Sequence, residues 1–235
     1  MTELNSDKDD MDGDPAGLSW YEAVPLLICA AITKDSYLRS ICHKVASLST
    51  CSNCCNNIGE LNLNEFQLVQ SILIGDNSFR SIETFCIDGL PRLYRLEIGN
   101  DSFTSVTPKH WRVPFTNEAL LQRLNKTNKS FHILNCEKLK SIKIGVFSFS
   151  DFAGQFELKN LPSLECIKIG TIDDVNNLSS NFHFSSFHLT GNDCYWFITL
   201  LDLPALKTLY LGGGVFQRSL FTKLESIRIF EITIV

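Results

Sequence analysis

The cysteines are the residues of this chain with the clearest capacity for chemistry. Cys51, Cys54 and Cys55 form a C-x-x-C-C cluster, and Cys42-His43 lies close enough in the sequence to complete four ligands. Thiolate and imidazole groups are the donors that zinc prefers. A second C-x-x-C pair is missing, however, so we predict neither a metal nor a cofactor. Because the chain has nine cysteines and no evident export signal, we expect free thiols rather than disulfides.

Other candidate sites each lack an essential group. Five aspartates near the N-terminus are spaced like a calcium loop, but Lys8 and Ser19 fall where its first and last carboxylate ligands belong. The glycines at 212–214 lack the Lys and Ser or Thr that follow in a phosphate-binding loop. The chain has no Gly-x-Ser-x-Gly motif and no cysteine with a partner histidine in a family-specific setting. We therefore predict that the protein is not an enzyme.

The overall charge argues against a function that depends on strong electrostatic attraction, such as binding to nucleic acid. The net charge of the chain is −5, and residues 1–22 alone carry seven acids against Lys8, which leaves the remainder near +1. A nearly neutral body gives no footprint for nucleic acid. The apolar run Val24 to Ile32 is short and contains Pro25, and no stretch approaches the ~18–20 apolar residues of a membrane span. We expect a cytoplasmic, intracellular protein without a membrane span.

An apolar skeleton that recurs six times must position whatever site the chain has. It reads F/I/L-x-I/L-x-x-L-x-x-L-x-x-I-x-I, usually closed by Gly, and its copies begin at Leu61, Phe85, Phe131, Phe156, Ile198 and Phe216. The closing glycines are 24, 46, 25 and 42 residues apart, so the unit is 24 or 25 residues long. Two intervals carry insertions, near 104–130 and 171–197. A period of this length predicts a solenoid.

Each unit predicts one short strand and one aromatic anchor. The L-x-x-I-x-I segment has the period-2 spacing of a strand with inward Ile, so stacked copies predict a parallel sheet. We expect the Gly to turn the chain through a positive φ, and a following Ser-Phe pair to return an aromatic to the core. Six inward side chains per unit are worth roughly 1.5–3 kcal/mol each. The first insertion reads as a loop with a short helix over 117–124, and the second as either a decayed repeat or a loop packed on the solenoid.

These segments resemble the leucine-rich repeat family, and the Ser-Phe element is similar to its BspA-like subclass. The resemblance rests on segments such as Leu93 to Ile98 and Leu206 to Leu211, and it covers 58–235. It implies an α/β or mainly β repeat fold, a solenoid with a parallel β-sheet on its concave face. The internal asparagine ladder of the family is not expected, because Asn stands at its position only at Asn77.

The resemblance makes the concave sheet the commonest binding face. The residues between the inward strand positions would line it, namely Leu73, Glu97, Lys143, Lys168, Tyr210 and Arg228. Three cations and a Tyr in a row suggest a landing surface for an acidic segment of another protein, although a merely solvated face is the alternative.

The two ends of the chain differ from the repeats. Residues 1–17 are polar and acidic, which predicts a disordered tail. Residues 18–57 predict an N-terminal helical cap, because Leu38, Ile41, Val45 and Leu48 recur at helical spacing. An earlier helix is possible over Tyr21 to Ile32. The apolar residues 230–235 lie where a polar cap should begin, which predicts either a truncated gene product or self-association through the C-terminal repeat.

The sequence thus favours a non-enzymatic scaffold for protein–protein interaction. Two other functions stay open. The solenoid could be the substrate-recruiting subunit of an enzyme complex such as a ubiquitin ligase. It could also be a surface or secreted adhesion protein, as BspA-like repeats often are, although the missing export signal argues against this function.

Overall fold

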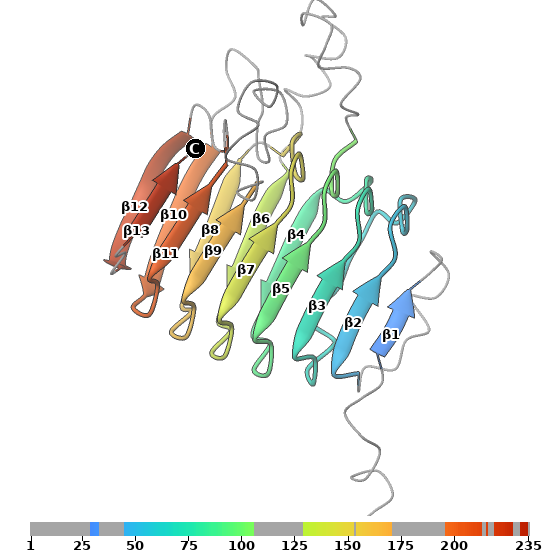
Figure 1. The fold of residues 1–235 in the computed structure, drawn as a ribbon, viewed down its shortest axis with the longest axis horizontal. Coiled ribbons are helices and arrows are strands. Elements are labelled where there is room, and N and C mark those ends of the chain that lie inside the picture. Colours follow the sequence, from blue (N-terminus) through green and yellow to red (C-terminus); the bar gives the residue numbers. More distant parts are fainter. Residues whose placement is uncertain are drawn as a thin grey trace, which may run out of the picture.

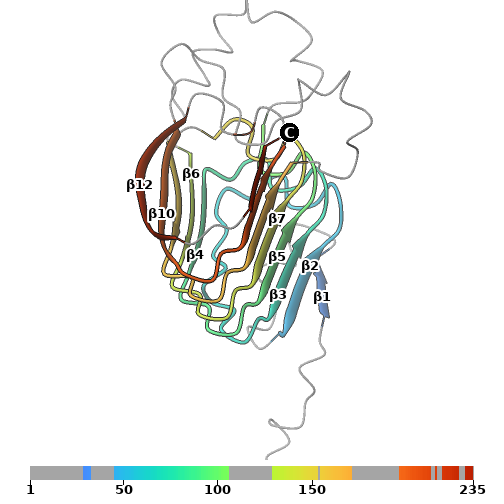
Figure 2. The same ribbon diagram turned by 60° about the vertical axis from the view of Figure 1, so that its left-hand side comes forward.

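The described residues form two parallel β-sheets that face each other (Figures 1 and 2). The computed structural model describes residues 29–32, 45–105, 129–152, 154–170, 196–212, 215, 219–227 and 231–234, and no helix occurs among them. The eight-stranded sheet contains, in spatial order, β1 (Cys29–Ile32), β2 (Ser47–Thr50), β3 (Ser71–Ile74), β5 (Arg95–Ile98), β7 (Ser141–Ile144), β9 (Cys166–Ile169), β11 (Thr208–Leu211) and β13 (Glu231–Ile234). The five-stranded sheet contains β12 (Ser219–Ile227), β10 (Trp196–Leu203), β8 (Gln155–Lys159), β6 (Ser130–Leu134) and β4 (Thr84–Asp88).

From β3 onward the chain alternates between the two sheets. One strand of the eight-stranded sheet and the next strand of the five-stranded sheet, with the links between them, make one repeat. Figure 2 shows these repeats lying one behind another with similar outlines. The sequence prediction of a mainly β repeat fold with a parallel sheet is confirmed.

The inward aliphatic positions of the eight-stranded sheet are those expected from the sequence. Ile72 pairs with Leu96, Leu96 with Ile142, and Ile142 with Ile167 in neighbouring strands. All four side chains are at most 1% exposed. Short strands with β-branched residues at alternate positions bury one face and leave the other to solvent, as the period of two requires.

The five-stranded sheet was not expected. Its strands come from the first part of the skeleton, F/I/L-x-I/L, as in Phe85 and Ile87 of β4, which are both fully buried. Phe85 pairs with Phe131 of β6, and Phe131 with Phe156 of β8. The rings of these partners stack, with centroids 5.0 and 4.9 Å apart. The aromatic residues that begin each copy of the skeleton therefore belong to the strands of a second sheet.

Where residues 18–57 are described, they form strands and turns instead of the expected helical cap. Cys29–Ile32 is β1 and Ser47–Thr50 is β2, which pairs in register with β1 and β3. The helix predicted to include Leu48 is wrong there, because Leu48 is an inward strand residue that is 2% exposed. Outside the described residues lie 18–28 and 33–44, the tail 1–17 and the helix predicted over 117–124.

The last copy of the skeleton has another register than the sequence suggested. We expected its inward strand around Ile227, but β12 runs to Ile227 in the five-stranded sheet, and β13 completes the eight-stranded sheet. Tyr210 of β11 therefore pairs with Thr233. Arg228, which we had placed beside Tyr210, lies outside the described residues.

Both long intervals separate a strand of the eight-stranded sheet from the next strand of the five-stranded sheet. The first lies between β5 and β6, and the second between β9 and β10. Strands β8 and β10 pair directly, as do β9 and β11. Successive repeats thus pair directly across the second interval, and residues 171–195 themselves lie outside the described residues.

The glycines that close the skeleton are required for a reason other than the expected one. A Cβ on Gly75 would lie 2.6 Å from the main chain of Cys51, and one on Gly145 would lie 2.6 Å from the main chain of Gly99. Only Gly170 among these closing glycines has a positive φ, of 86°. Most of these glycines thus allow successive repeats to approach closely, whereas the left-handed conformation falls on neighbours such as Asn77 and Phe79.

A ladder of buried serines connects neighbouring repeats, in place of the internal asparagine ladder that was not expected here. Ser78, Ser102 and Ser148 are fully buried. The Ser78 N–H donates to Ser102 Oγ at 3.2 Å, and the Ser102 N–H donates to Ser148 Oγ at 3.1 Å. Each hydroxyl also donates to a carbonyl of the preceding repeat, on Cys51, Gly75 and Gly99 respectively. The serines therefore satisfy buried main-chain groups that no strand reaches.

The phenylalanines next to these serines stack beside the ladder. Phe79 stacks on Phe103 with ring centroids 5.2 Å apart, and Phe103 stacks on Phe149 at 4.7 Å. Phe149 also meets Phe131 of the five-stranded sheet edge to face at 5.1 Å. The Ser-Phe element thus joins the two sheets, and the prediction that its aromatic returns to the core is confirmed.

Candidate binding face

Five of the six predicted face residues lie side by side across the eight-stranded sheet. Their main chains pair in order, which gives the row Leu73, Glu97, Lys143, Lys168, Tyr210. We call these five residues the outward row. They point away from the core because they alternate with the buried inward positions. Five of the predicted residues thus share one row, their role as a binding face stays a prediction, and Arg228 lies outside the described residues.

The two lysines of the outward row are the most unusual feature of this face. Lys143 and Lys168 are direct partners on adjacent strands. Like charges placed directly opposite each other on neighbouring strands are destabilising. The Lys168 ammonium lies 5.1 Å from the centre of the Tyr210 ring, a cation–π distance that holds it over the fifth position of the row.

The acidic side chains near the outward row are already paired with basic ones. Arg95 contacts Glu97 at 2.7 Å on the same strand. Lys207 contacts Glu165 at 2.7 Å, and this hydrogen bond lowers the pKa of the Glu165 carboxyl. Both acids thus have a basic partner, although Glu97 is also the direct strand neighbour of Lys143. Because Arg95, Lys143, Lys168 and Lys207 outnumber Glu97 and Glu165, this part of the face has a net positive charge.

A groove runs along this positive centre. Its volume is about 270 Å³. It is lined by Glu97, Ser141, Ile142, Lys143, Cys166, Lys168 and Gly170. Two ammonium groups and one hydroxyl are hydrogen-bond donors that suit a carboxylate or another oxyanion.

A second row of polar residues, just before the strands of the same sheet, was not predicted from the sequence. Tyr94, Lys140, Glu165 and Lys207 are linked in order by main-chain hydrogen bonds of 2.9 Å from each N–H to the carbonyl before it. Each lies three residues before a member of the outward row, from Glu97 to Tyr210. The repeat spacing could have located these residues. Lys140 and Lys207 add to the positive charge, and Tyr94 is 44% exposed.

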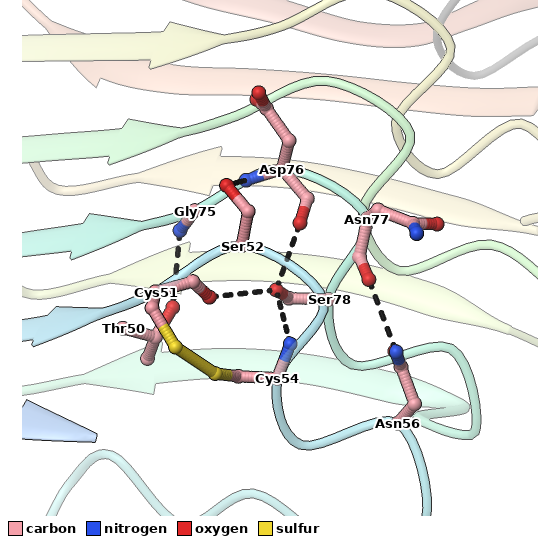
Figure 3. Close-up of a disulfide and its surroundings, with 9 residues drawn as sticks. All are labelled: Thr50, Cys51, Ser52, Cys54, Asn56, Gly75, Asp76, Asn77 and Ser78. Carbon is pink, nitrogen blue, oxygen red and sulfur yellow. Dashed lines mark hydrogen bonds between the residues drawn. A yellow bond between two sulfur atoms is a disulfide. The ribbon is translucent and has the colours of Figure 1, made fainter. Parts of the chain in front are cut away.

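The cysteine cluster contains a disulfide where we expected free thiols. Cys51 and Cys54 are joined at the turn after β2 (Figure 3). Within the described part of the chain, no group of His, Cys, Asp and Glu side chains is arranged to hold a metal ion. Cys42 and His43 lie outside that part. Cys136, on the link between β6 and β7, is fully buried.

Comparison of the chain with models of protein families, with curated proteins and with solved structures finds no match. Within the described residues, no helix has the length and apolar character needed to cross a membrane. The resemblance to leucine-rich repeats therefore continues to rest on the repeated residues themselves.

Proposed function

We propose that the chain is a leucine-rich repeat solenoid of the BspA-like kind that binds an acidic segment of another protein on the outward row. It works as a non-enzymatic scaffold, and Lys143, Lys168 and Tyr210 supply the main contacts. The partner is a protein with clustered Asp or Glu side chains.

The observation that carries this proposal is the direct pairing of Lys143 with Lys168. The fold requires only the inward residues of these strands to be apolar, so the outward pair is free to vary. Placing two cations opposite each other costs stability in the unbound protein. A bound carboxylate between them would remove that repulsion and add charge-assisted hydrogen bonds.

The test uses a defined probe. A fluorescent peptide rich in glutamate is titrated with the full-length protein and with the double variant Lys143→Ala/Lys168→Ala, and fluorescence anisotropy is measured. Two exposed ion pairs of 0.2–1 kcal/mol each predict roughly 2- to 30-fold weaker binding by the variant. The affinity of the natural chain should also fall as salt is added, because exposed charges are screened.

The matched control removes two lysines elsewhere. Lys138 lies in the link between β6 and β7, and Lys159 ends β8 in the other sheet; both are exposed. The variant Lys138→Ala/Lys159→Ala therefore changes the net charge equally. Equal weakening by the two double variants would show that only net charge matters and would refute the outward row as the site.

One observation favours the surface or secreted alternative. A disulfide joins Cys51 and Cys54, and disulfides persist mainly in oxidising compartments. The cytoplasmic location stays a prediction, which localisation of the tagged full-length chain tests. Affinity capture with mass spectrometry tests the remaining alternative, because recovery of ligase subunits would support a substrate-recruiting role.

A further inference from the structure

The Cys51–Cys54 pair occupies a defined position in the repeat. The Cys54 N–H donates to Ser78 Oγ at 3.2 Å, as the Ser78 N–H donates to Ser102 Oγ at the same distance in the next repeat. Cys54 therefore stands where later repeats have the ladder serine, and Cys51 stands where they have Gly. Whereas Ser78 and Ser102 donate to a carbonyl of the preceding repeat, Cys54 is bonded covalently within its own turn.

The two sulfurs differ in their access to solvent. Cys51 is exposed, whereas Cys54 is only 4% exposed. A thiol reagent can thus approach one end of the disulfide, while the other end remains packed in the core. The C-x-x-C spacing, with a sequence separation of 3, is that of many redox-active pairs. We propose that Cys51 and Cys54 form a redox site that cycles between disulfide and dithiol while the surrounding repeat stays folded.

The turn has enough other bonds to keep its shape without the disulfide (Figure 3). Ser78 Oγ accepts from the Cys54 N–H and donates to the Cys51 carbonyl, both at 3.2 Å. The Asn53 N–H donates to the Asp76 carbonyl at 2.8 Å, and the Gly75 N–H donates to Thr50 Oγ1 at 3.0 Å. These bonds connect the turn to the next repeat.

The disulfide itself also contributes little to the fold. It closes a very short loop, and a short loop removes little conformational entropy from the unfolded chain. Since neither the neighbouring hydrogen bonds nor the chain entropy depends strongly on the S–S bond, breaking it should have a local effect.

The reaction is a two-electron thiol–disulfide exchange with a dithiol reductant. A thiolate of the reductant attacks the exposed Cys51 Sγ, the Cys51–Cys54 bond breaks, and the Cys54 sulfur leaves as a thiolate that takes up a proton. The second thiol of the reductant then attacks its own sulfur in the mixed disulfide. Cys51 leaves as a thiolate and is protonated, and the reductant departs as a disulfide.

The experiment equilibrates the full chain in buffers of reduced and oxidised dithiothreitol. Free thiols are trapped by alkylation and assigned by peptide mass spectrometry. We expect Cys51 and Cys54 to convert together in a single two-electron transition. The melting temperature and the hydrogen exchange of residues 45–58 should stay nearly unchanged through that transition. In the reduced folded protein, Cys51 should be alkylated at least tenfold faster than Cys54.

Two variants control the assignment. Cys51→Ser/Cys54→Ser should abolish the transition, and Cys86→Ser, on β4 of the other sheet, should leave it intact. The proposal is overturned if both cysteines are alkylated in the oxidised buffer. It is equally overturned if reduction occurs only in denaturant, or if reduction raises the hydrogen exchange of β2 to that of an unfolded chain.

Discussion

Replacing Ser102 with alanine tests whether the buried serine ladder stabilises the stack of repeats. Ser102 is fully buried, and its hydroxyl serves two repeats at once. It donates to the Gly75 carbonyl at 2.8 Å and accepts from the Ser78 N–H at 3.2 Å. Ser102→Ala removes both bonds without adding volume, so the change isolates the hydrogen bonds from packing.

The expected loss follows from the two main-chain groups that lose this partner. A buried donor or acceptor left unsatisfied costs about 1–3 kcal/mol. Because two groups are affected, Ser102→Ala should lower the free energy of unfolding by about 2–6 kcal/mol. For a chain of this size, 1 kcal/mol corresponds to about 2–4 °C, so the melting temperature should fall by roughly 4–24 °C.

Urea unfolding followed by circular dichroism measures this loss, with Ser81→Ala as the matched control. The Ser81 hydroxyl donates to the Asn56 carbonyl at 2.7 Å on the exposed surface, where water can replace it. We expect the control to lose less than about 1 kcal/mol. Amide exchange at Ser78 should rise only in Ser102→Ala. Equal losses from both variants would refute the ladder as a source of stability.

Three further predictions use the same unfolding assays or light scattering. Leu96→Asp should unfold neighbouring repeats because it buries an unpaired charge at a fully buried position, whereas Lys168→Ala should leave the melting temperature nearly unchanged; equal losses would contradict the inward and outward assignment. Burial raises the pKa of the Cys136 thiol to about 11. The protonated Cys136 thiol therefore stabilises the folded state fully below its unfolded pKa of about 8.5, and this contribution is lost as the pH rises through about 11. Cys136→Val should make the fall of stability with rising pH less steep in urea melts. Self-association through the C-terminal repeat should appear as a mass that grows with concentration in light scattering, and a monomer at all concentrations would exclude it.

The sequence predicted the parts of the fold that depend on packing with a fixed period. The positions of Leu93, Leu96 and Ile98 recur at the same offsets in every copy of the skeleton. These three side chains are buried as expected. The same offsets placed the five described residues of the outward row side by side, since residues between inward positions must face the other way. Period and alternation are local properties, so a single sequence contains them.

The features that the sequence did not reveal depend on contacts between repeats. The F-x-I segments are too short for their period of two to distinguish a strand from an anchor, so the second sheet was missed. In the Ser-Phe pairs, the sequence predicted a role only for the aromatic residue. The hydrogen bonds between repeats are made by the serines, as at Ser78 and Ser102. The register of the last copy failed because the closing Gly is absent there and Phe230 stands in its place.

The contrast between the two faces of each strand is the physical reason for assigning function to the outward row. Inward residues are constrained by stacking, because Gly75, Ser78 and Phe79 meet the equivalent atoms of the next repeat. Outward residues lie on the solvent side of the sheet, and the contact between Lys168 and Tyr210 joins two members of the outward row, so packing of the core does not determine their type. The paired lysines at 143 and 168 even oppose folding slightly through their repulsion. A choice that the fold neither requires nor favours is best accounted for by a ligand of opposite charge, and it is this step that the double lysine variant tests.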